Sequence, residues 1–465
     1  MDIYTLLSLI NNYIIGWPFL LFILSASLLC TVALKGIQLR YFFRSWQYLF
    51  APAKIEEVRF CANTLSSPEG DVRATKECVD MSPFQAFINS LSSNIGNATL
   101  VGPAIAIFEG GPGALFWMFF IAQLLMAVRF SSVYLGLFFA QTAQPSKRVL
   151  GGPLLYLQYV SGGSFLSVLY ALFCLFYILI FSSSFQAYSI SSSLNSSWGV
   201  PTIVTATVLA FFVAYLAFGN AQRIAKVSEM IVPVKLFVFF IFTSSLLIYH
   251  HTALLSSLKL ILVHAFTAKA VGGGALGFTV QQAFRFGVLR SVMGLEAGIG
   301  TVAIMFGATG SKQPEKDAIM SMLSVFITSI VCFISGLCII VSGVWTGPAH
   351  GPALVMEAFA TLFGSYGCWA VSFLTVTFGL GVLAAVTYIM REVWLFLTGG
   401  RFLMTGMALY ALFAFGGALV EPGFILKTGD LVVAALLLIN LYAVLYLLPV
   451  TRRGVITFMN SDEGR

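Results

Sequence analysis

The composition of this 465-residue chain identifies it as a membrane protein. Hydrophobic residues make up 59% of the sequence and charged residues only 9%, with apolar runs recurring along its whole length. These proportions exclude a water-soluble domain of this size. The seven cysteines form no Cys-x-x-Cys pair and no cluster with histidine. The sequence therefore predicts neither a zinc site nor a disulfide framework, and no organic cofactor.

A scan with a window of about 20 residues finds candidate membrane spans throughout the chain. Eleven are expected, near residues 16–36, 84–108, 113–139, 164–193, 200–218, 228–249, 270–306, 318–345, 365–390, 402–420 and 429–449. Most lysines and arginines fall in loops on one side, and only Lys259, Lys269 and Lys427 lie clearly on the other. The positive-inside rule then places the N-terminus outside and the C-terminus in the cytoplasm. Topology accounts for the net charge of +7, so nucleic acid is not an expected partner.

The predicted spans divide the chain into four parts. Residues 1–80 hold a peripheral first span and a cytoplasmic loop, 81–250 a first set of five spans, 265–450 a second set of five, and 451–465 a cytoplasmic tail. The first set begins inside and the second outside, so any structural repeat between them must be inverted. We expect an all-α integral membrane protein in the inner membrane of a bacterium, with a monomer as a plausible assembly.

The first span of the first set is interrupted by a polar stretch, SLSSNIGNATLVGP at residues 90–103. Its serines, asparagines and glycines compete for backbone hydrogen bonds or loosen a helix. Backbone that opens at membrane depth is tolerated only where it faces protein or a water-filled cavity. We therefore expect a broken helix that lines a central binding site, as in many secondary transporters. The alternative is a pair of intact helices that approach closely across small residues.

The second set of spans also opens with a disrupted segment. It begins with three glycines at residues 272–274 and continues through GLEAGIG at 294–300. Interrupted first helices in two inverted halves are the best sequence indication of a binding site near the membrane midplane.

Several stretches, taken together, resemble motifs of the alanine or glycine:cation symporter family. They are GGPGALFWMFF at residues 110–120, GNAQRIAKVSEMIVP at 219–233, GFTVQQAFRFGVLR at 277–290 with LEAGIGT at 295–301, and MLSVFI at 322–327. They occur in order and span about residues 84–400. The resemblance implies a LeuT-type fold, an inverted repeat of five plus five helices, here preceded by one extra helix. It also implies uptake of small neutral amino acids, alanine or glycine in D or L form, usually driven by a sodium gradient.

The sequence departs from the family at positions expected to line the pocket. GNAT at residues 96–99 stands where the family typically has Gly-Thr-Gly-Asn, and GL at 294–295 replaces Ser-Asn. In the ninth span the family has Ser-Thr and, four residues later, Trp; our best alignment places GV at 381–382 and Val386 at these positions. Thr328 replaces an acidic residue. The resemblance thus carries over the fold, whereas substrate and coupling ion stay open.

An amino-acid zwitterion needs partners for both of its charges in such a pocket. Backbone N–H groups near Asn97 can receive the carboxylate at a helix N-terminus. Carbonyls freed by the break, with nearby hydroxyls, suit the ammonium or a sodium ion. Gln186 matches a family glutamine and either fixes the ligand or makes an interhelical hydrogen bond. The predicted substrate-binding residues are Ser93, Gly96, Asn97, Ala98, Thr99, Gln186, Gly294, Glu296, Gly298, Val382 and Val386, and the candidate sodium ligands are Ser92, Asn94 and Thr301.

Three charged residues fall within apolar segments. Glu296 either holds a proton or cation, or forms a structural ion pair with Arg285 or Arg290. Arg129 and Lys235 are interpreted as snorkelling or structurally paired side chains rather than as transport residues.

A membrane-embedded enzyme is the first competing class. The predicted spans contain no histidine, no pair of aspartates and no His-Glu-x-x-His motif, so no catalytic set is indicated. A degenerate transporter that senses amino acids without moving them is a second alternative. We favour a secondary transporter that imports small neutral amino acids by alternating access, with sodium as first candidate for the coupling ion. Proton-coupled or ion-independent uptake with an altered substrate range is the remaining alternative.

Overall fold

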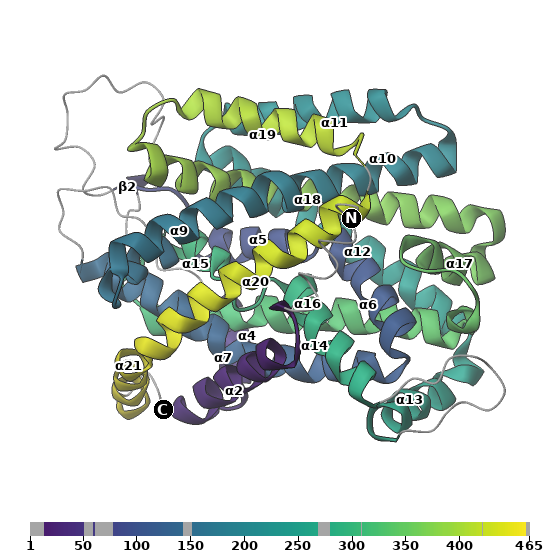
Figure 1. Cartoon of the computed structure of the whole chain (residues 1–465), viewed down its shortest axis with the longest axis horizontal. Coiled ribbons are helices and arrows are strands. Elements are labelled where there is room, and N and C mark those ends of the chain that lie inside the picture. Colours follow the sequence, from purple (N-terminus) through teal and green to yellow (C-terminus); the bar gives the residue numbers. More distant parts are fainter. Residues whose placement is uncertain are drawn as a thin grey trace.

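A computed structural model describes residues 14–50, 59–60, 78–142, 151–267, 280–307, 309–420 and 422–461. Nearly all of these residues are helical (Figure 1). A single pair of two-residue parallel strands, β1 (Arg59–Phe60) and β2 (Cys78–Val79), is present within the described ranges. The glycines at 272–274 lie outside them, so the start of the second disrupted segment is not described.

The helices up to residue 250 contain the first broken span. In chain order they are α2 (Trp17–Ala33), α3 (Ile37–Arg40), α4 (Phe42–Phe50), α5 (Pro83–Asn94), α6 (Asn97–Gly110), α7 (Gly113–Thr142), α8 (Pro153–Tyr156), η2 (Leu157–Tyr159), α9 (Gly163–Phe176), the π-helix η3 (Tyr177–Ser183), α10 (Ser184–Trp198), α11 (Thr202–Ala217) and α12 (Ala221–Tyr249).

The remaining helices contain the second break. They are α13 (His251–Phe266), α14 (Val280–Leu295), α15 (Thr301–Gly307), α16 (Pro314–Val341), η4 (Val344–Thr346), α17 (Pro352–Phe363), η5 (Gly364–Tyr366), α18 (Gly367–Thr398), α19 (Leu403–Gly417), α20 (Pro422–Tyr446) and α21 (Leu448–Asn460). Helices α13 and α17, which the hydropathy scan did not predict, lie at one end of the molecule, and β2 and α21 lie at the other (Figure 1).

Each predicted span overlaps described helices, and residues 270–279 of the span at 270–306 lie outside the described ranges. Six of the described spans are long and apolar enough to cross a membrane, and the bent pair α5–α6 makes a seventh. Shorter apolar helices include α2, α11 and α19. The chain is thus a multi-helix membrane protein, while eleven crossings, the inverted repeat, the four-part division and the orientation stay predictions.

The first break separates α5 from α6 by a bend of 42°. Helix α5 starts at a capping box, in which the Ser82 hydroxyl accepts from the Gln85 N–H and the Gln85 side chain accepts from the Ser82 N–H. It ends at Asn94, and Gly96 is extended at φ −120°, ψ −170° before α6 begins. The polar stretch at 90–103 therefore contains a true helix break, as its composition predicts.

The second break lies between α14 and α15 and has a left-handed backbone. Gly298 and Gly300 have φ values of +93° and +88°, which glycine adopts readily. Asn440 of α20 holds this turn, because its amide donates to the Gly298 carbonyl at 2.6 Å and to the Ser132 hydroxyl at 3.1 Å. Its amide oxygen accepts from the Tyr156 hydroxyl. One buried side chain thus joins the second break to α7, α8 and α20.

Replacing Asn440 with leucine tests this connection. Leucine has a similar size but leaves the Gly298 carbonyl and the two hydroxyls without their partner, and each buried unsatisfied group costs about 1–3 kcal/mol. We expect a clear fall in the thermal unfolding temperature of the purified protein. An unchanged unfolding temperature would show that the second break does not depend on Asn440.

Candidate functional site

The first break leaves two main-chain carbonyls at the C-terminal end of α5 without the N–H donors that they would have in a continuous helix. In a continuous helix the carbonyl of Ile95 would accept from the N–H of Thr99, but that N–H donates to the Gly96 carbonyl at 3.0 Å. The buried ammonium of Lys235 instead donates to the carbonyls of Ser92 at 2.9 Å and Ile95 at 2.8 Å. The carbonyls at the break are therefore satisfied by a side chain of α12.

Glu296 is the first residue after α14 and lies at the second break. Its φ of +48° is left-handed, a conformation that costs a residue other than glycine about 1–3 kcal/mol and often occurs at functional sites. The Ser93 hydroxyl donates to one carboxylate oxygen at 2.8 Å, and the Tyr177 hydroxyl donates to the other. The guanidinium of Arg129 donates to the main-chain carbonyl of Glu296 at 3.1 Å. Glu296 thus connects the two breaks directly through Ser93.

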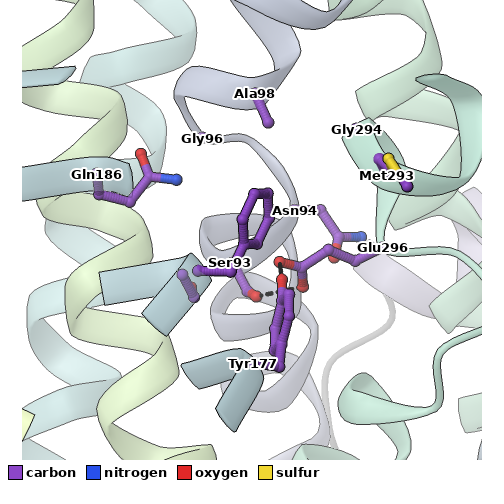
Figure 2. A pocket seen from close by; sticks show the side chains of 11 residues that line it. Ser93, Asn94, Gly96, Ala98, Tyr177, Gln186, Met293, Gly294 and Glu296 are labelled. Carbon is purple, nitrogen blue, oxygen red and sulfur yellow. Dashed lines mark hydrogen bonds between the residues drawn. The ribbon is translucent and has the colours of Figure 1, made fainter. Parts of the chain in front are cut away.

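A small cavity lies where the two breaks meet (Figure 2). Its volume is about 10 Å³, the space of roughly one water molecule. An amino acid needs far more room, so binding one requires the surrounding helices to move apart. The lining residues are Ser93, Asn94, Gly96, Ala98, Tyr177, Phe181, Ser182, Gln186, Met293, Gly294 and Glu296.

A second cavity of about 20 Å³ shares part of this lining. The two cavities have Ala98, Phe181, Met293 and Gly294 in common, and the second continues along α6 to Ile105. Small gaps therefore follow the face of α6 away from Glu296.

Four lining residues were not predicted from the sequence. Tyr177, Phe181 and Ser182 belong to the π-helix η3, and Met293 lies near the end of α14. A π-helix inside a longer helix is often found at functional sites. It brings Tyr177 to the Glu296 carboxylate, whereas hydropathy shows only a continuous apolar span over this segment. The cluster of serines at 182–184 is the one sequence signal of irregularity there.

Gln186 lies beside the first break (Figure 2). Its side-chain oxygen accepts from the N–H of Asn97 at 3.1 Å, so it makes the interhelical hydrogen bond that was one of its two expected roles. This N–H is also one of the groups expected to receive a substrate carboxylate. Gln186 would have to release it for that carboxylate to bind there.

The other predicted substrate-binding residues lie around the cavity rather than on its wall. The Thr99 hydroxyl donates to the Gly96 carbonyl at 2.6 Å, and the Asn97 side chain is buried without a hydrogen-bond partner in the described part of the chain. Gly298 belongs to the turn held by Asn440. Val382 and Val386 are buried on α18, and a side-chain atom of Val382 lies against Gly96.

The candidate sodium ligands have separate environments. The Ser92 hydroxyl donates to the Gly381 carbonyl at 2.8 Å. Asn94 makes a long contact of 3.4 Å to the Ser324 hydroxyl, and its amide oxygen has no partner among the described residues. The Thr301 hydroxyl is likewise buried and unpartnered within the described ranges. Their role as sodium ligands stays a prediction.

The charged residues of the apolar segments are buried rather than snorkelling. Arg129 is 3% exposed and Lys235 is 0% exposed. Arg290 does not pair with Glu296 but lies 3.8 Å from the carboxylate of Asp430, and the Arg285 guanidinium lies over the ring of Phe286. The alternative of a structural ion pair of Glu296 with Arg290 is therefore wrong, and the cation that contacts Glu296 is Arg129, through the main-chain carbonyl of Glu296.

Comparison with known proteins identifies the family. The model of the sodium:alanine symporter family matches residues 1–464. The chain belongs to this family. The resemblance seen in the sequence motifs is thereby confirmed, and the protein is a cation-coupled amino-acid transporter of the multi-pass membrane class rather than an enzyme.

The individual relatives are distant. An uncharacterized transporter of Haemophilus influenzae is 29% identical over 96% of this chain and 94% of its own length. The sodium/alanine symporter AgcS of Methanococcus maripaludis is 27% identical over 96% and 95%. A Na⁺-coupled sialic acid symporter superimposes on 92% of this chain and 86% of its own with a TM-score of 0.51 at 11% identity. This last likeness concerns the fold alone.

Glutamine in place of Glu296 tests the interaction between the buried charges of Glu296 and Arg129. The change removes a buried negative charge close to Arg129, whose guanidinium contacts the main-chain carbonyl of Glu296 rather than its carboxylate, so the cost should lie below that of a directly paired buried charge, about 3–5 kcal/mol. We expect the Glu296→Gln variant to unfold at a lower temperature, and the double variant with Arg129→Met to recover part of the loss. A double variant as unstable as the sum of the two single variants would contradict this pairing.

Proposed function

We propose that this chain imports small neutral amino acids, alanine or glycine in the first place, by alternating access around the two helix breaks. The observation that carries the proposal is the cavity at which both breaks meet, with the buried Glu296 carboxylate on its wall. Transport sites near the membrane midplane are commonly built from interrupted helices in this way. The inner membrane of a bacterium is the proposed location.

The Glu296 carboxylate on the cavity wall and the main-chain N–H groups beside it fit the two charges of a zwitterion. The ammonium of an amino acid would pair with Glu296 and the Ser93 hydroxyl, which already lie in contact. The carboxylate would bind the N–H groups of Asn97 and Ala98 at the start of α6, where the helix dipole is positive, once Gln186 has released the N–H of Asn97. An amino acid placed so would span the two breaks with one charge at each.

The close packing of the cavity wall favours a substrate with a small side chain. Gly96 is closely packed, because a Cβ atom added there would lie 2.5 Å from Val382 Cγ2 and 3.0 Å from Gln186 Nε2. Phe181 and Met293 fill the adjacent space. Larger aliphatic substrates remain worth testing, since the smaller Val386 stands where our alignment places a family tryptophan.

The coupling ion is open between sodium, which the family description names, and the proton. A sensor that binds amino acids without transporting them is the remaining alternative. Uptake of labelled alanine and glycine into proteoliposomes, under an imposed sodium gradient, a proton gradient or neither, separates these outcomes. Binding in a thermal-shift assay without uptake under any gradient would contradict transport and favour the sensor.

Alanine in place of Gly96 tests the site itself. The new Cβ would collide with Val382 and press on Gln186, and overpacking of this kind costs about 1–3 kcal/mol. We expect uptake to fall strongly in Gly96→Ala and to recover in the double variant with Val382→Ala, which removes the colliding atom. Gly416→Ala is the matched control, because a Cβ there meets open space within helix α19. Normal uptake by Gly96→Ala would remove the first break from the mechanism.

A further inference from the structure

Lys235 is a fully buried lysine on a helix that otherwise faces largely outward. In the most apolar 18-residue stretch of α12 only 28% of the residues are buried inside the protein, against 72% for the same measure in α16. Lys235 is nevertheless 0% exposed. Burying an ammonium is costly unless its charge and its three N–H groups find partners. Among the described residues, no carboxylate lies within ion-pair distance of Lys235. Its partners are therefore dipoles rather than an anion.

Those dipoles are the two carbonyls exposed by the first helix break. The ammonium lies 2.9 Å from the Ser92 carbonyl oxygen and 2.8 Å from that of Ile95, at the negative C-terminal end of α5. It also lies 5.9 Å from the ring centroid of Phe378 on α18, within the range of a cation–π contact. Carbonyls at the end of a broken half-helix are the groups with which transporters of this architecture coordinate a coupling cation.

Helix α18 packs against the Lys235 ammonium from the other side and provides no additional ligand for a metal ion. A Cβ atom at Gly381 would lie 2.9 Å from the Lys235 nitrogen and 3.0 Å from the Ser92 hydroxyl, so glycine makes room for the ammonium. The Gly381 carbonyl already accepts from Ser92, and neither Gly381 nor Val382 has a hydroxyl group. A sodium ion prefers several oxygen ligands, and it would find few free here.

The ammonium and a sodium ion exclude each other from this position. Two unit charges 4 Å apart repel strongly where water is excluded, and both need the same two carbonyl oxygens. We propose that the Lys235 ammonium permanently takes the place of a sodium ion at the first helix break, so that transport by this chain does not require sodium. The ion-binding part of this proposal is independent of the proposed substrate, whereas its uptake part rests on the proposed function.

The ion-binding experiment compares the purified wild type with Lys235→Ala. Unfolding temperatures are measured in rising sodium chloride, with choline chloride at equal concentration as the reference. We expect no sodium-specific shift for the wild type and a saturable upward shift for Lys235→Ala, in which the two carbonyls have lost their cation. Lys226→Ala, the same change at an exposed position of α12, should behave as the wild type. An equal sodium response in wild type and Lys235→Ala, or none in a folded Lys235→Ala, would overturn the proposal.

The uptake experiment uses proteoliposomes and whichever amino acid the wild type accumulates. Wild-type uptake should be the same in sodium and in choline buffers. In choline buffer the uptake rate of Lys235→Ala should be about tenfold or more below that of the wild type, the usual effect of removing a charged hydrogen-bond donor. In sodium buffer its uptake rate should recover. A merely structural lysine would not give recovery by one particular ion.

The outcomes separate the two proposals. Wild-type uptake that disappears in choline overturns the replacement of sodium by Lys235 and leaves amino-acid import intact. Absence of uptake of any amino acid by the wild type contradicts the proposed import, and the sodium-dependent unfolding of Lys235→Ala still decides the role of the lysine. If Lys235→Ala does not fold, the wild-type comparison in sodium and choline remains decisive.

Discussion

The structure depends on satisfying main-chain carbonyls that two helix breaks expose inside a membrane. No water in the hydrocarbon core can replace a lost helical hydrogen bond, so each opened carbonyl requires a donor from the protein. At the first break Lys235 supplies two such bonds and the Thr99 hydroxyl a third. At the second break the Glu296, Gly298 and Ile299 carbonyls accept from side chains of three other helices, Arg129, Asn440 and Tyr170. Both breaks are therefore fixed by the helices around them.

These contacts also determine how the two breaks can move. Ser93 and Glu296 are joined by a hydrogen bond across them, and Tyr177 adds a contact from the π-helix η3. The cavity between them holds about one water, so an amino acid can enter only if one break separates from the other. Its ammonium can then take over the hydrogen bonds of the Glu296 carboxylate. The substrate thus replaces the contact that its entry disrupts, which keeps the buried carboxylate partnered throughout.

The sequence predicts the breaks but not the side chains that complete them. Serine, asparagine and glycine between residues 90 and 103 weaken a helix locally, so that signal is readable from the chain. Residues such as Tyr177 and Asn440 gain their role from partners more than 100 positions away. Lys235 illustrates the limit well. A single lysine in an apolar span usually reaches for the membrane surface, and only the tertiary contacts place its ammonium at the broken helix.

A tethered ammonium differs from a bound ion in what it can contribute to transport. A sodium ion that binds with the substrate leaves with it, and its gradient then drives accumulation. The ammonium of Lys235 supplies the same charge at the same carbonyls but stays attached to α12, so it cannot carry energy across the membrane as a solute does. It would stabilise the broken helix in the substrate-free protein as well as in the loaded one. Under the proposed replacement of sodium by Lys235 the coupling cation would be a proton, and Glu296, the buried carboxylate on the cavity wall, is the group placed to bind it.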